Sequence, residues 1–314
     1  MDRDNWAGEA LVFLLGHPRS GTTFLGRFLG AHPDVAYWEE PELLGSLRRI
    51  HETLVRLYRH LAVDAGLDTT PLFRVSTREQ VELTTTKQEH ADELAVRQTR
   101  DIAQRLQQEF QLRAGKPILL EKTPGQVLPV EGLRELLPQA KAIHIIRDPR
   151  DVASSLLRWI QREGWPPWLP AGDDPVAVMA GQWAVQVRDG LRAADESTSM
   201  FTLRHEDLVA TPVEVGHELC QFLGIDWSPR LDEFLERGFD TGIDPKTVGV
   251  WRDELTDAQV ATVVGGAGEL MVALGYLDES GRAAAVSRGG RRLARASQKL
   301  FGAARADRRP PATS

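Results

Sequence analysis

Cysteine is nearly absent from this sequence. Cys220 is the only cysteine among 314 residues, which excludes an internal disulfide framework and favours a reducing, cytoplasmic setting. The nearby apolar residues Leu219 and Phe222 favour a buried packing role for this thiol over a chemical one.

Long hydrophobic runs are missing as well. No stretch approaches the roughly eighteen uncharged apolar residues that a transmembrane helix needs, so none is predicted. The chain starts with the polar sequence Met-Asp-Arg-Asp-Asn-Trp, and the apolar run behind it is short. We interpret this start as the approach to a first strand and not as a signal peptide.

The sequence also lacks histidine spacings typical of metal sites, and its residues 1–281 have no excess of basic side chains. The eight histidines show no spacing such as H-E-x-x-H, and no metal is expected. Nine of the 38 Lys and Arg residues, but only one of the 45 Asp and Glu residues, lie in 282–314, so residues 1–281 carry a formal net charge of −15. So acidic a body argues against nucleic-acid binding.

These charges suggest two parts of the chain. We expect residues 1–281 to form one domain and residues 282–314 to be a disordered basic tail. The alternative for the tail is a basic helix that contacts an anionic surface through Leu293, Leu300 and Phe301.

Short apolar runs alternate with helical patterns along the body. The predicted strands are 10–15, 117–120, 142–146 and 200–203, and the clearest predicted helices are 91–112, 149–162, 176–194, 212–223 and 257–274. Asp148-Pro149 and Thr256 are typical helix starts. The alternation predicts an α/β protein with three layers (α/β/α), a central mainly parallel sheet and helical insertions.

Residues 11–29, LVFLLGHPRSGTTFLGRFL, predict a strand, a tight loop and a helix. Gly16, Gly21, Thr22 and Thr23 fit the phosphate-loop spacing G-x-x-x-x-G-K-[ST], with Thr22 in place of the lysine. Successive amide N–H groups and a helix N-terminus in such a loop converge on an anion. The segment therefore predicts a P-loop-like anion site, in which Arg19 supplies a cation from a different angle than the missing lysine.

A second strand, turn and helix lies in residues 142–155, AIHIIRDPRDVASS. Arg147 follows the carboxyl end of the predicted strand, where open α/β sheets bind ligands. Ser155 is two helical turns further on and can face the same side. Together their side chains could hold a phosphate through charge-assisted hydrogen bonds.

With both segments present, the sequence resembles the sulfotransferases that use 3′-phosphoadenosine 5′-phosphosulfate (PAPS), over residues 11–276. PRSGTT, at 18–23, resembles their loop for the 5′-phosphosulfate, and RDPRDVASS resembles their 3′-phosphate site. The resemblance implies transfer of a sulfuryl group from PAPS to an acceptor hydroxyl or phenol. It assigns to the donor Arg19, Ser20, Gly21, Thr22, Thr23, Arg147 and Ser155.

On the acceptor side the sequence is similar to the tyrosylprotein sulfotransferases and their bacterial relatives. AHPDVAYWEEP, at 31–41, resembles the segment that carries their catalytic glutamate, here Glu40 with Glu39 beside it. EKTP, at 121–124, resembles the segment that carries their active-site lysine, here Lys122. The resemblance implies Glu40 as the general base, with Arg19 and Lys122 stabilising the reacting oxygens.

The sequence also departs from the family pattern. Pro124 stands where cytosolic small-molecule sulfotransferases have a catalytic histidine, and Lys246 is the only cation left from a basic R-K-G element. Gly249 and Trp251 follow in the family's order, and Trp251 fits either a place beside the donor or a core position. His205 replaces a tyrosine that commonly approaches the adenine.

Two other functions compete with this interpretation. A phosphate-loop kinase of a nucleoside or small molecule would need the lysine that Thr22 replaces and a metal-holding acid, for which Asp148 at a helix start is a poor candidate. A non-catalytic nucleotide-binding module would not need Arg19, Glu40 and Lys122 all to be present.

The acceptor side of the sequence leaves the substrate open. A small molecule, a glycan and a peptide are all acceptable, and a homodimer is compatible with the sequence. We expect the helical insertion 41–112 and the Trp- and Pro-rich loop 165–175 to line the acceptor site. Trp165 and Trp168 in this loop suit an apolar, an aromatic or a stacked carbohydrate acceptor.

Overall fold

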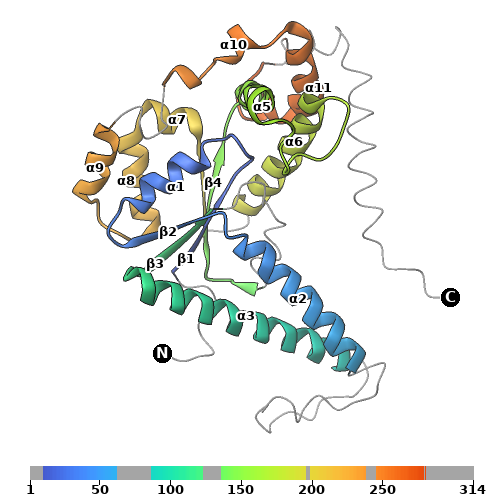
Figure 1. The fold of residues 1–314 in the computed structure, drawn as a ribbon, viewed down its shortest axis with the longest axis vertical. Coiled ribbons are helices and arrows are strands. Elements are labelled where there is room, and N and C mark those ends of the chain that lie inside the picture. Colours follow the sequence, from blue (N-terminus) through green and yellow to red (C-terminus); the bar gives the residue numbers. More distant parts are fainter. Residues whose placement is uncertain are drawn as a thin grey trace, which may run out of the picture.

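The fold is built on one sheet of parallel strands (Figure 1). The computed structural model of the protein describes residues 10–61, 86–122, 136–195, 199–237, 245–278 and 280. The five strands of its sheet are β1 (Leu11–Leu15), β2 (Val35–Glu39), β3 (Ile118–Lys122), β4 (Lys141–Ile146) and β5 (Met200–Arg204). They lie in the order β2-β3-β1-β4-β5, and each neighbouring pair is parallel. The predicted parallel sheet is confirmed.

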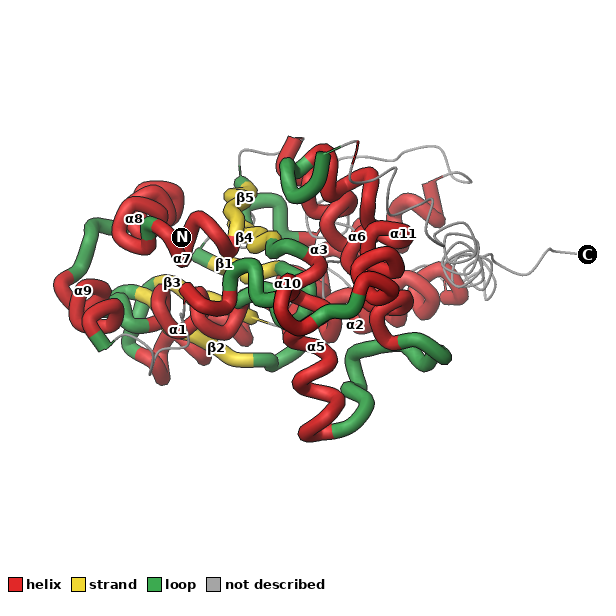
Figure 2. The backbone as a smooth tube through the Cα atoms, turned by 90° about the horizontal axis from the view of Figure 1, so that it is seen from above, coloured by secondary structure: helices red, strands yellow, loops and turns green. Residues whose placement is uncertain are grey.

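Helices cover both faces of the sheet, as Figure 2 shows from above. One face packs against α1 (Thr22–Gly30), α7 (His205–Ala210), α8 (Pro212–Leu223) and α9 (Pro229–Glu236). The other packs against α2 (Leu43–Arg59), α3 (Thr86–Ala114) and α6 (Pro175–Asp195), and α6 is in turn covered by α5 (Pro149–Glu163) and α11 (Asp257–Ala273). The short helices η4 (Pro245–Thr247) and α10 (Trp251–Glu254) precede α11.

Strand β1 is buried on both of its faces, which explains its continuous apolar sequence. Val12 and Leu14 pack in the cluster with α1 and α8, whereas Leu11, Phe13 and Leu15 pack in the cluster with α2 and α3. Because successive side chains of a strand point to opposite faces, such a strand needs a helical layer on each side. The three-layer α/β/α arrangement is confirmed.

Both predicted helix starts are present. The Asp148 carboxylate accepts the backbone N–H of Arg150 at the start of α5. Thr256 and Gln259 form a reciprocal capping box at the start of α11. Residues 164–174, which include most of the Trp- and Pro-rich segment, lie outside regular structure as expected.

Other elements differ from the sequence prediction. Strand β2 was not predicted, because its sequence VAYWE ends in partly exposed polar and aromatic residues. The helix predicted over 91–112 is longer, since α3 begins at Thr86. It packs along α2 to form the helical insertion at the bottom of Figure 1. The predicted tail, 282–314, and Pro124 lie outside the described residues.

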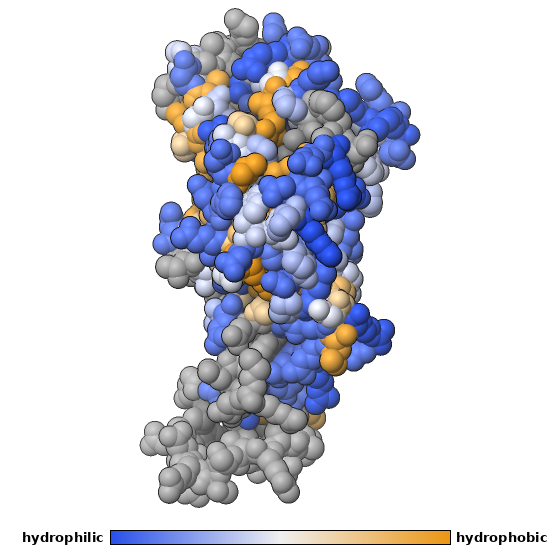
Figure 3. Space-filling model, turned by 90° about the vertical axis from the view of Figure 1, so that its left-hand side faces the viewer, coloured by the Kyte–Doolittle hydropathy of each residue, from blue (hydrophilic) through white to orange (hydrophobic). Residues whose placement is uncertain are grey.

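The molecular face drawn in Figure 3 is mainly hydrophilic, with separate hydrophobic areas between the polar ones. Among the helices that the structure describes, none combines the length and the apolar composition that crossing a membrane requires.

One buried histidine links the stability of the fold to pH. His144 of β4 is fully buried, and its ring packs so closely on α6 that a Cβ on Gly190 would lie 2.3 Å from Cε1 of the imidazole. Burial lowers the pKa of His144 to about 4. Between pH 6.5 and 4 the unfolded chain therefore binds a proton at His144 that the folded protein does not, and stability falls as the pH falls.

We predict that His144→Leu reduces this pH dependence. The difference in unfolding free energy between pH 7.5 and pH 5.5 should shrink by about 1 kcal/mol, the contribution of one such histidine one pH unit below its unfolded pKa. Urea denaturation at the two pH values measures the difference. His217→Leu, at an exposed histidine of α8, is the control, and an equal change in both variants would contradict the assignment to His144.

Candidate active site

The predicted phosphate loop connects β1 to the N-terminus of α1. Its turn is closed by a hydrogen bond from the backbone N–H of Ser20 to the carbonyl of His17, at 3.1 Å. Gly21 precedes the helix with a φ of 96°, a left-handed conformation that favours glycine. Because Gly21 has no side chain to cap the helix, the first-turn N–H groups, including those of Thr22 and Thr23, are arranged as in a helix N-terminus that can accept an anion.

The sheet order places three predicted site segments together. β1 lies between β3 and β4, with Leu14 opposite Lys122 and Leu15 opposite His144. The loop after β1 is therefore flanked by Lys122, at the end of β3, and Arg147, just beyond β4. This is the carboxyl edge of the sheet, where the chain order changes direction and open α/β sheets bind ligands.

Arg19 joins the two predicted phosphate segments. Its Nε donates to the Ser155 hydroxyl at 3.0 Å, and its carbonyl accepts a hydrogen bond from Nη1 of Arg147 at 2.9 Å. The guanidinium also lies over the ring of Trp159, 5.2 Å from the centroid. Arg19 has a φ of 73°, which is uncommon for a residue with a side chain. These contacts hold the strained residue in place.

The same cluster concentrates positive charge. Burial lowers the pKa of Arg19, and the guanidinium groups of Arg147, Arg162 and Arg158 lower it further. Burial also lowers the pKa of Arg147. A bound anion would relieve this repulsion, so the cluster is suited to hold a phosphate.

Lys122 and Glu40 form the second cluster of the site. The Lys122 side chain is fully buried, and its Nζ lies 2.7 Å from Oε1 of Glu40, 3.3 Å from Oε1 of Glu39 and 3.2 Å from Oγ1 of Thr23. The side chain of Glu40 is 58% exposed. A buried ammonium thus meets a solvent-accessible carboxylate beside the start of α1.

Strand geometry explains which acids pair with Lys122. Glu121, its neighbour in β3, points to the opposite face and accepts the backbone N–H of Leu43 at the start of α2. Glu39 lies directly opposite Lys122 in the ladder between β2 and β3. Glu40 follows β2 with a φ of 55°, and its N–H donates to the Lys122 carbonyl at 2.7 Å.

His205 lies against the phosphate loop. It is 4% exposed, and a Cβ on Gly21 would lie 2.5 Å from its Nδ1. Burial and the charge of Arg147 lower the pKa of His205 to about 3. Neither ring nitrogen has a hydrogen-bond partner within the part of the chain that the structure describes.

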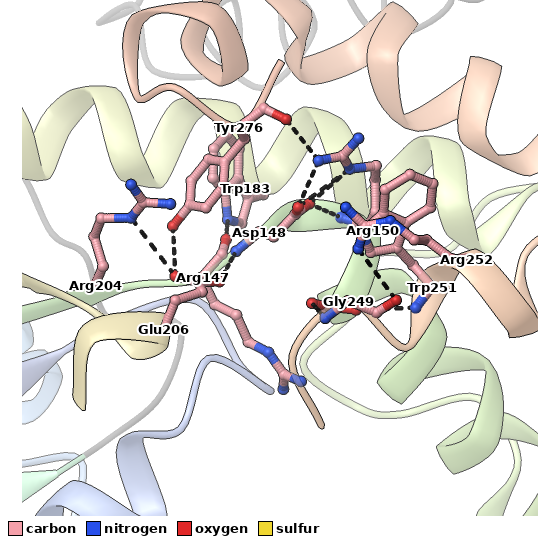
Figure 4. A network of polar contacts seen from close by, with 11 residues as sticks. Arg147, Asp148, Arg150, Trp183, Arg204, Glu206, Gly249, Trp251, Arg252 and Tyr276 are labelled. Atoms are coloured by element: carbon pink, nitrogen blue, oxygen red, sulfur yellow. Dashed lines mark hydrogen bonds and ion pairs between the residues drawn. The ribbon is translucent and has the colours of Figure 1, made fainter. Parts of the chain in front are cut away.

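Gly249 and Trp251, the donor-side residues predicted near the end of the domain, lie beside the start of α5 (Figure 4). The Asp151 carboxylate accepts the backbone N–H groups of Gly249 and Trp251, and the ring of Trp251 stacks on the guanidinium of Arg150, 3.9 Å from the centroid. Lys246 is exposed on η4. Trp251 therefore packs against the protein through a face of its ring, and Gly249 through its backbone.

Glu39, expected only as the neighbour of Glu40, shares Lys122 with it. Two further contributors were not predicted from the sequence: Trp159 stacks on Arg19, and Asp151 holds Gly249 and Trp251. Of these two, only Asp151 carried a local signal, because it is four residues from Ser155 on a predicted helix. Across the described residues, no group of three or more His, Cys, Asp or Glu side chains is placed to hold a metal ion.

A parallel sheet with a phosphate loop at its carboxyl edge is the architecture of the P-loop-like α/β proteins. Within that class the chain belongs to the sulfotransferase family, whose profile matches residues 11–229. The chain is therefore a transferase that moves sulfuryl groups, and the kinase interpretation is set aside.

Individual relatives agree with this assignment. The nodulation protein NoeE of Sinorhizobium fredii is 30% identical over 310 residues, which cover 88% of this chain and 68% of NoeE. Protein-tyrosine sulfotransferase 1 of Danio rerio is 27% identical over 69% of this chain, which spans only 54% of that enzyme.

Solved structures share the fold. The sulfotransferase domain of the Synechococcus PCC 7002 olefin synthase matches with a TM-score of 0.52 and 23% identity, covering 81% of this chain and 90% of that domain. The sulfotransferase domain of the curacin biosynthetic pathway matches with a TM-score of 0.51 and 20% identity, and the match covers 80% of this chain and 93% of that domain.

The contact of Gly21 with His205 predicts the effect of a single methyl group. Gly21→Ala should destabilise the protein by several kcal/mol, because it adds about 1–2 kcal/mol of left-handed backbone strain to a clash with the imidazole. In the double variant with His205→Ala the clash disappears, and only the strain should remain. Thermal or urea denaturation of the four proteins tests this. Strictly additive effects would contradict the proposed contact.

Proposed function

We propose that the protein transfers a sulfuryl group from PAPS to an acceptor hydroxyl or phenol. The observation that carries the choice of donor is the contact of Arg19 with Ser155 and Arg147. It joins two anion-binding turns at one edge of the sheet, as a nucleotide with separate 5′ and 3′ anionic groups requires.

In this proposal the donor lies along the carboxyl edge of the sheet. The 5′-phosphosulfate occupies the loop residues Ser20, Gly21, Thr22 and Thr23 at the N-terminus of α1. The 3′-phosphate lies at Arg147, Ser155 and the side chain of Arg19. The buried imidazole of His205 adjoins the same loop and is assigned to the nucleotide, as are Gly249, Trp251 and the exposed Lys246.

The positions of the two cations suggest different roles. The Arg19 side chain contacts Ser155 and Trp159, so we assign it to donor binding and not to the reacting oxygens. Lys122 contacts Thr23 in the loop and Glu40 outside it. We therefore assign to Lys122 the stabilisation of charge on the sulfuryl and bridging oxygens.

Glu40 is the proposed general base. The acceptor oxygen attacks sulfur in line, and its bond to sulfur forms as the bond from sulfur to the bridging oxygen breaks. The acceptor proton passes to the Glu40 carboxylate, and adenosine 3′,5′-bisphosphate leaves. Protonated Glu40 no longer attracts the Lys122 ammonium, which can then turn toward the developing negative charge.

The acceptor remains to be chosen among a small molecule, a glycan and a peptide. The relatives' names specify chemically different acceptors, a protein tyrosine in one case and a hydroxylated dihydromenaquinone in another. We propose that the insertion of α2 and α3 and the loop 164–174 select among such acceptors. Screening phenols, alcohols, glycans and peptides by mass spectrometry for the gain of one sulfuryl group would identify the class.

The environment of the protein can be proposed from its single thiol. Cys220 is free and 2% exposed on the core face of α8, as expected for a structural cysteine. Together with the absence of other cysteines from the sequence, it supports a reducing, cytoplasmic location.

Replacing Arg147 should remove selectivity for the 3′-phosphate. We expect the native protein to bind adenosine 3′,5′-bisphosphate far better than adenosine 5′-phosphate. Arg147→Ala should cost about 2–3 kcal/mol of that preference, the usual scale for a charge-assisted contact. Calorimetry with both nucleotides measures it, with Arg113→Ala, at an exposed arginine of α3, as control. Equal affinity of the native protein for the two nucleotides would contradict the choice of donor.

Replacing Glu40 should impair turnover while leaving the donor bound. Glu40→Gln keeps the shape of the side chain but removes its basicity, so turnover on an identified acceptor should fall by about 10²–10⁴-fold. Affinity for adenosine 3′,5′-bisphosphate should change little, because Glu40 faces the acceptor. Steady-state kinetics and calorimetry separate the two effects.

Controls for Glu40 follow from the contacts. Glu42→Gln is the matched control, because Glu42 also has a left-handed backbone and an exposed carboxylate, which pairs with Arg49. Glu39→Gln should have an intermediate effect, since Glu39 also contacts Lys122. Near-normal turnover of Glu40→Gln together with inactive Glu39→Gln would move the base to Glu39.

A further inference from the structure

The late segment, residues 245–254, retains only Lys246 of the basic R-K-G element, and it is held to α5 and the residues just before it by other contacts. Its Thr247 carbonyl accepts a hydrogen bond from Nη2 of Arg147 at 2.6 Å. The ring of Trp251 stacks on Arg150, and Glu254 forms an ion pair with Arg158. All three partners belong to α5 or to the residues just before it.

Asp151 makes the central contact of this group. It is 1% exposed, and its two carboxylate oxygens accept the backbone N–H groups of Gly249 and Trp251 at 2.7 and 3.0 Å. Burial raises the pKa of Asp151, while these two hydrogen bonds and the charge of Arg147 oppose the rise. Each oxygen of the buried acid thus has a donor from the late segment.

The position of Asp151 raises an electrostatic problem. Asp151 and Ser155 are four residues apart in α5, so they lie on one side of the helix, and Arg147, just before the helix, is close enough for its charge to act on Asp151. A carboxylate between two phosphate-binding residues would repel the phosphate if its oxygens faced the donor. The two backbone N–H groups draw those oxygens toward the late segment and disperse their charge.

The same contacts determine how Arg147 is presented. Its guanidinium is held at one end by the Arg19 carbonyl and at the other by the Thr247 carbonyl. Thr247 is two residues from Gly249, which Asp151 anchors. Loss of the Asp151 contacts would loosen the segment that carries the Thr247 carbonyl, one of the two groups that orient Arg147.

We propose that Asp151 is a positioning residue for the 3′-phosphate of the donor, acting through Gly249 and Thr247 on Arg147. This inference rests on the proposed function, because it assumes a donor that carries a 3′-phosphate. The basic element missing from the late segment is replaced by backbone contacts that Asp151 organises.

The test measures selectivity between two nucleotides. Asp151→Asn keeps one acceptor oxygen but turns an amide donor toward the other N–H. Its preference for adenosine 3′,5′-bisphosphate over adenosine 5′-phosphate, measured by calorimetry, should fall about tenfold. Affinity for the 5′-phosphate should stay within about twofold of native, because no 3′-phosphate contact is involved. A carboxylate that acts only by repulsion predicts the reverse, a higher preference after its charge is removed.

A second variant changes the other end of the hydrogen bond between Gly249 and Asp151. Gly249→Ala leaves the Asp151 charge intact but strains a backbone whose φ is 78°, and its Cβ would lie 2.4 Å from Nη1 of Arg252. It should lower the preference in the same direction, and the double variant should lose little more than either single one. Glu163→Gln, at an exposed acid of α5, is the control and should retain the native preference.

The outcomes separate this inference from the proposed function. Native protein without any preference for the 3′-phosphorylated nucleotide would overturn the proposed donor itself. Native preference that survives in both Asp151→Asn and Gly249→Ala would overturn only the role of Asp151. Should Asp151→Asn fail to fold, as judged by circular dichroism, the result with Gly249→Ala decides.

Discussion

The parallel pairing of β1 with β3 and β4 is the constraint on which the rest of the structure depends. Because all three strands run in one direction, Lys122, the phosphate loop and Arg147 leave the sheet at the same edge. The register that buries Leu14 and Phe13 on opposite faces also fixes which side chains at that edge face α1. Core and site are thus set by one hydrogen-bond ladder, and a slip of one residue would disrupt both.

Local signals in the sequence were sufficient for much of this arrangement. A strand buried on both faces is a continuous apolar run, and a phosphate loop is a contiguous stretch of glycines and hydroxyl residues, so β1 and its loop could be predicted. Arg147 and Ser155 could be joined because helix geometry relates them. Strand β2 could not be predicted, since it pairs on one side only and ends in exposed residues. Its neighbour in the sheet, β3, is distant in sequence, and so is Lys122, the residue with which Glu39 and Glu40 pair.

Side-chain direction was the second quantity that the sequence did not contain. The resemblance to sulfotransferases placed Arg19 near the reacting oxygens, whereas the structure directs its guanidinium to Ser155 and Trp159. Arg19 also has a left-handed backbone, which no propensity rule predicts for arginine. Strand alternation already excludes Glu121 as an ion-pair partner of Lys122. Only the pairing of β2 with β3 identifies Glu39 and Glu40 as its partners.

These directions divide the work of the site between a fixed end and an adjustable one. At the Arg147 end, the backbone carbonyls of Arg19 and Thr247 hold the guanidinium in a fixed orientation, which suits binding. At the Lys122 end, the three N–H donors of the ammonium are shared among Thr23, Glu39 and Glu40. Under the proposed mechanism one of these contacts must be exchanged as charge moves to the leaving group. Glu40 is suited to that exchange, because taking up the acceptor proton removes the charge through which it holds Lys122. The departure of the proton and the stabilisation of the leaving group are then two effects of one event at a single ion pair.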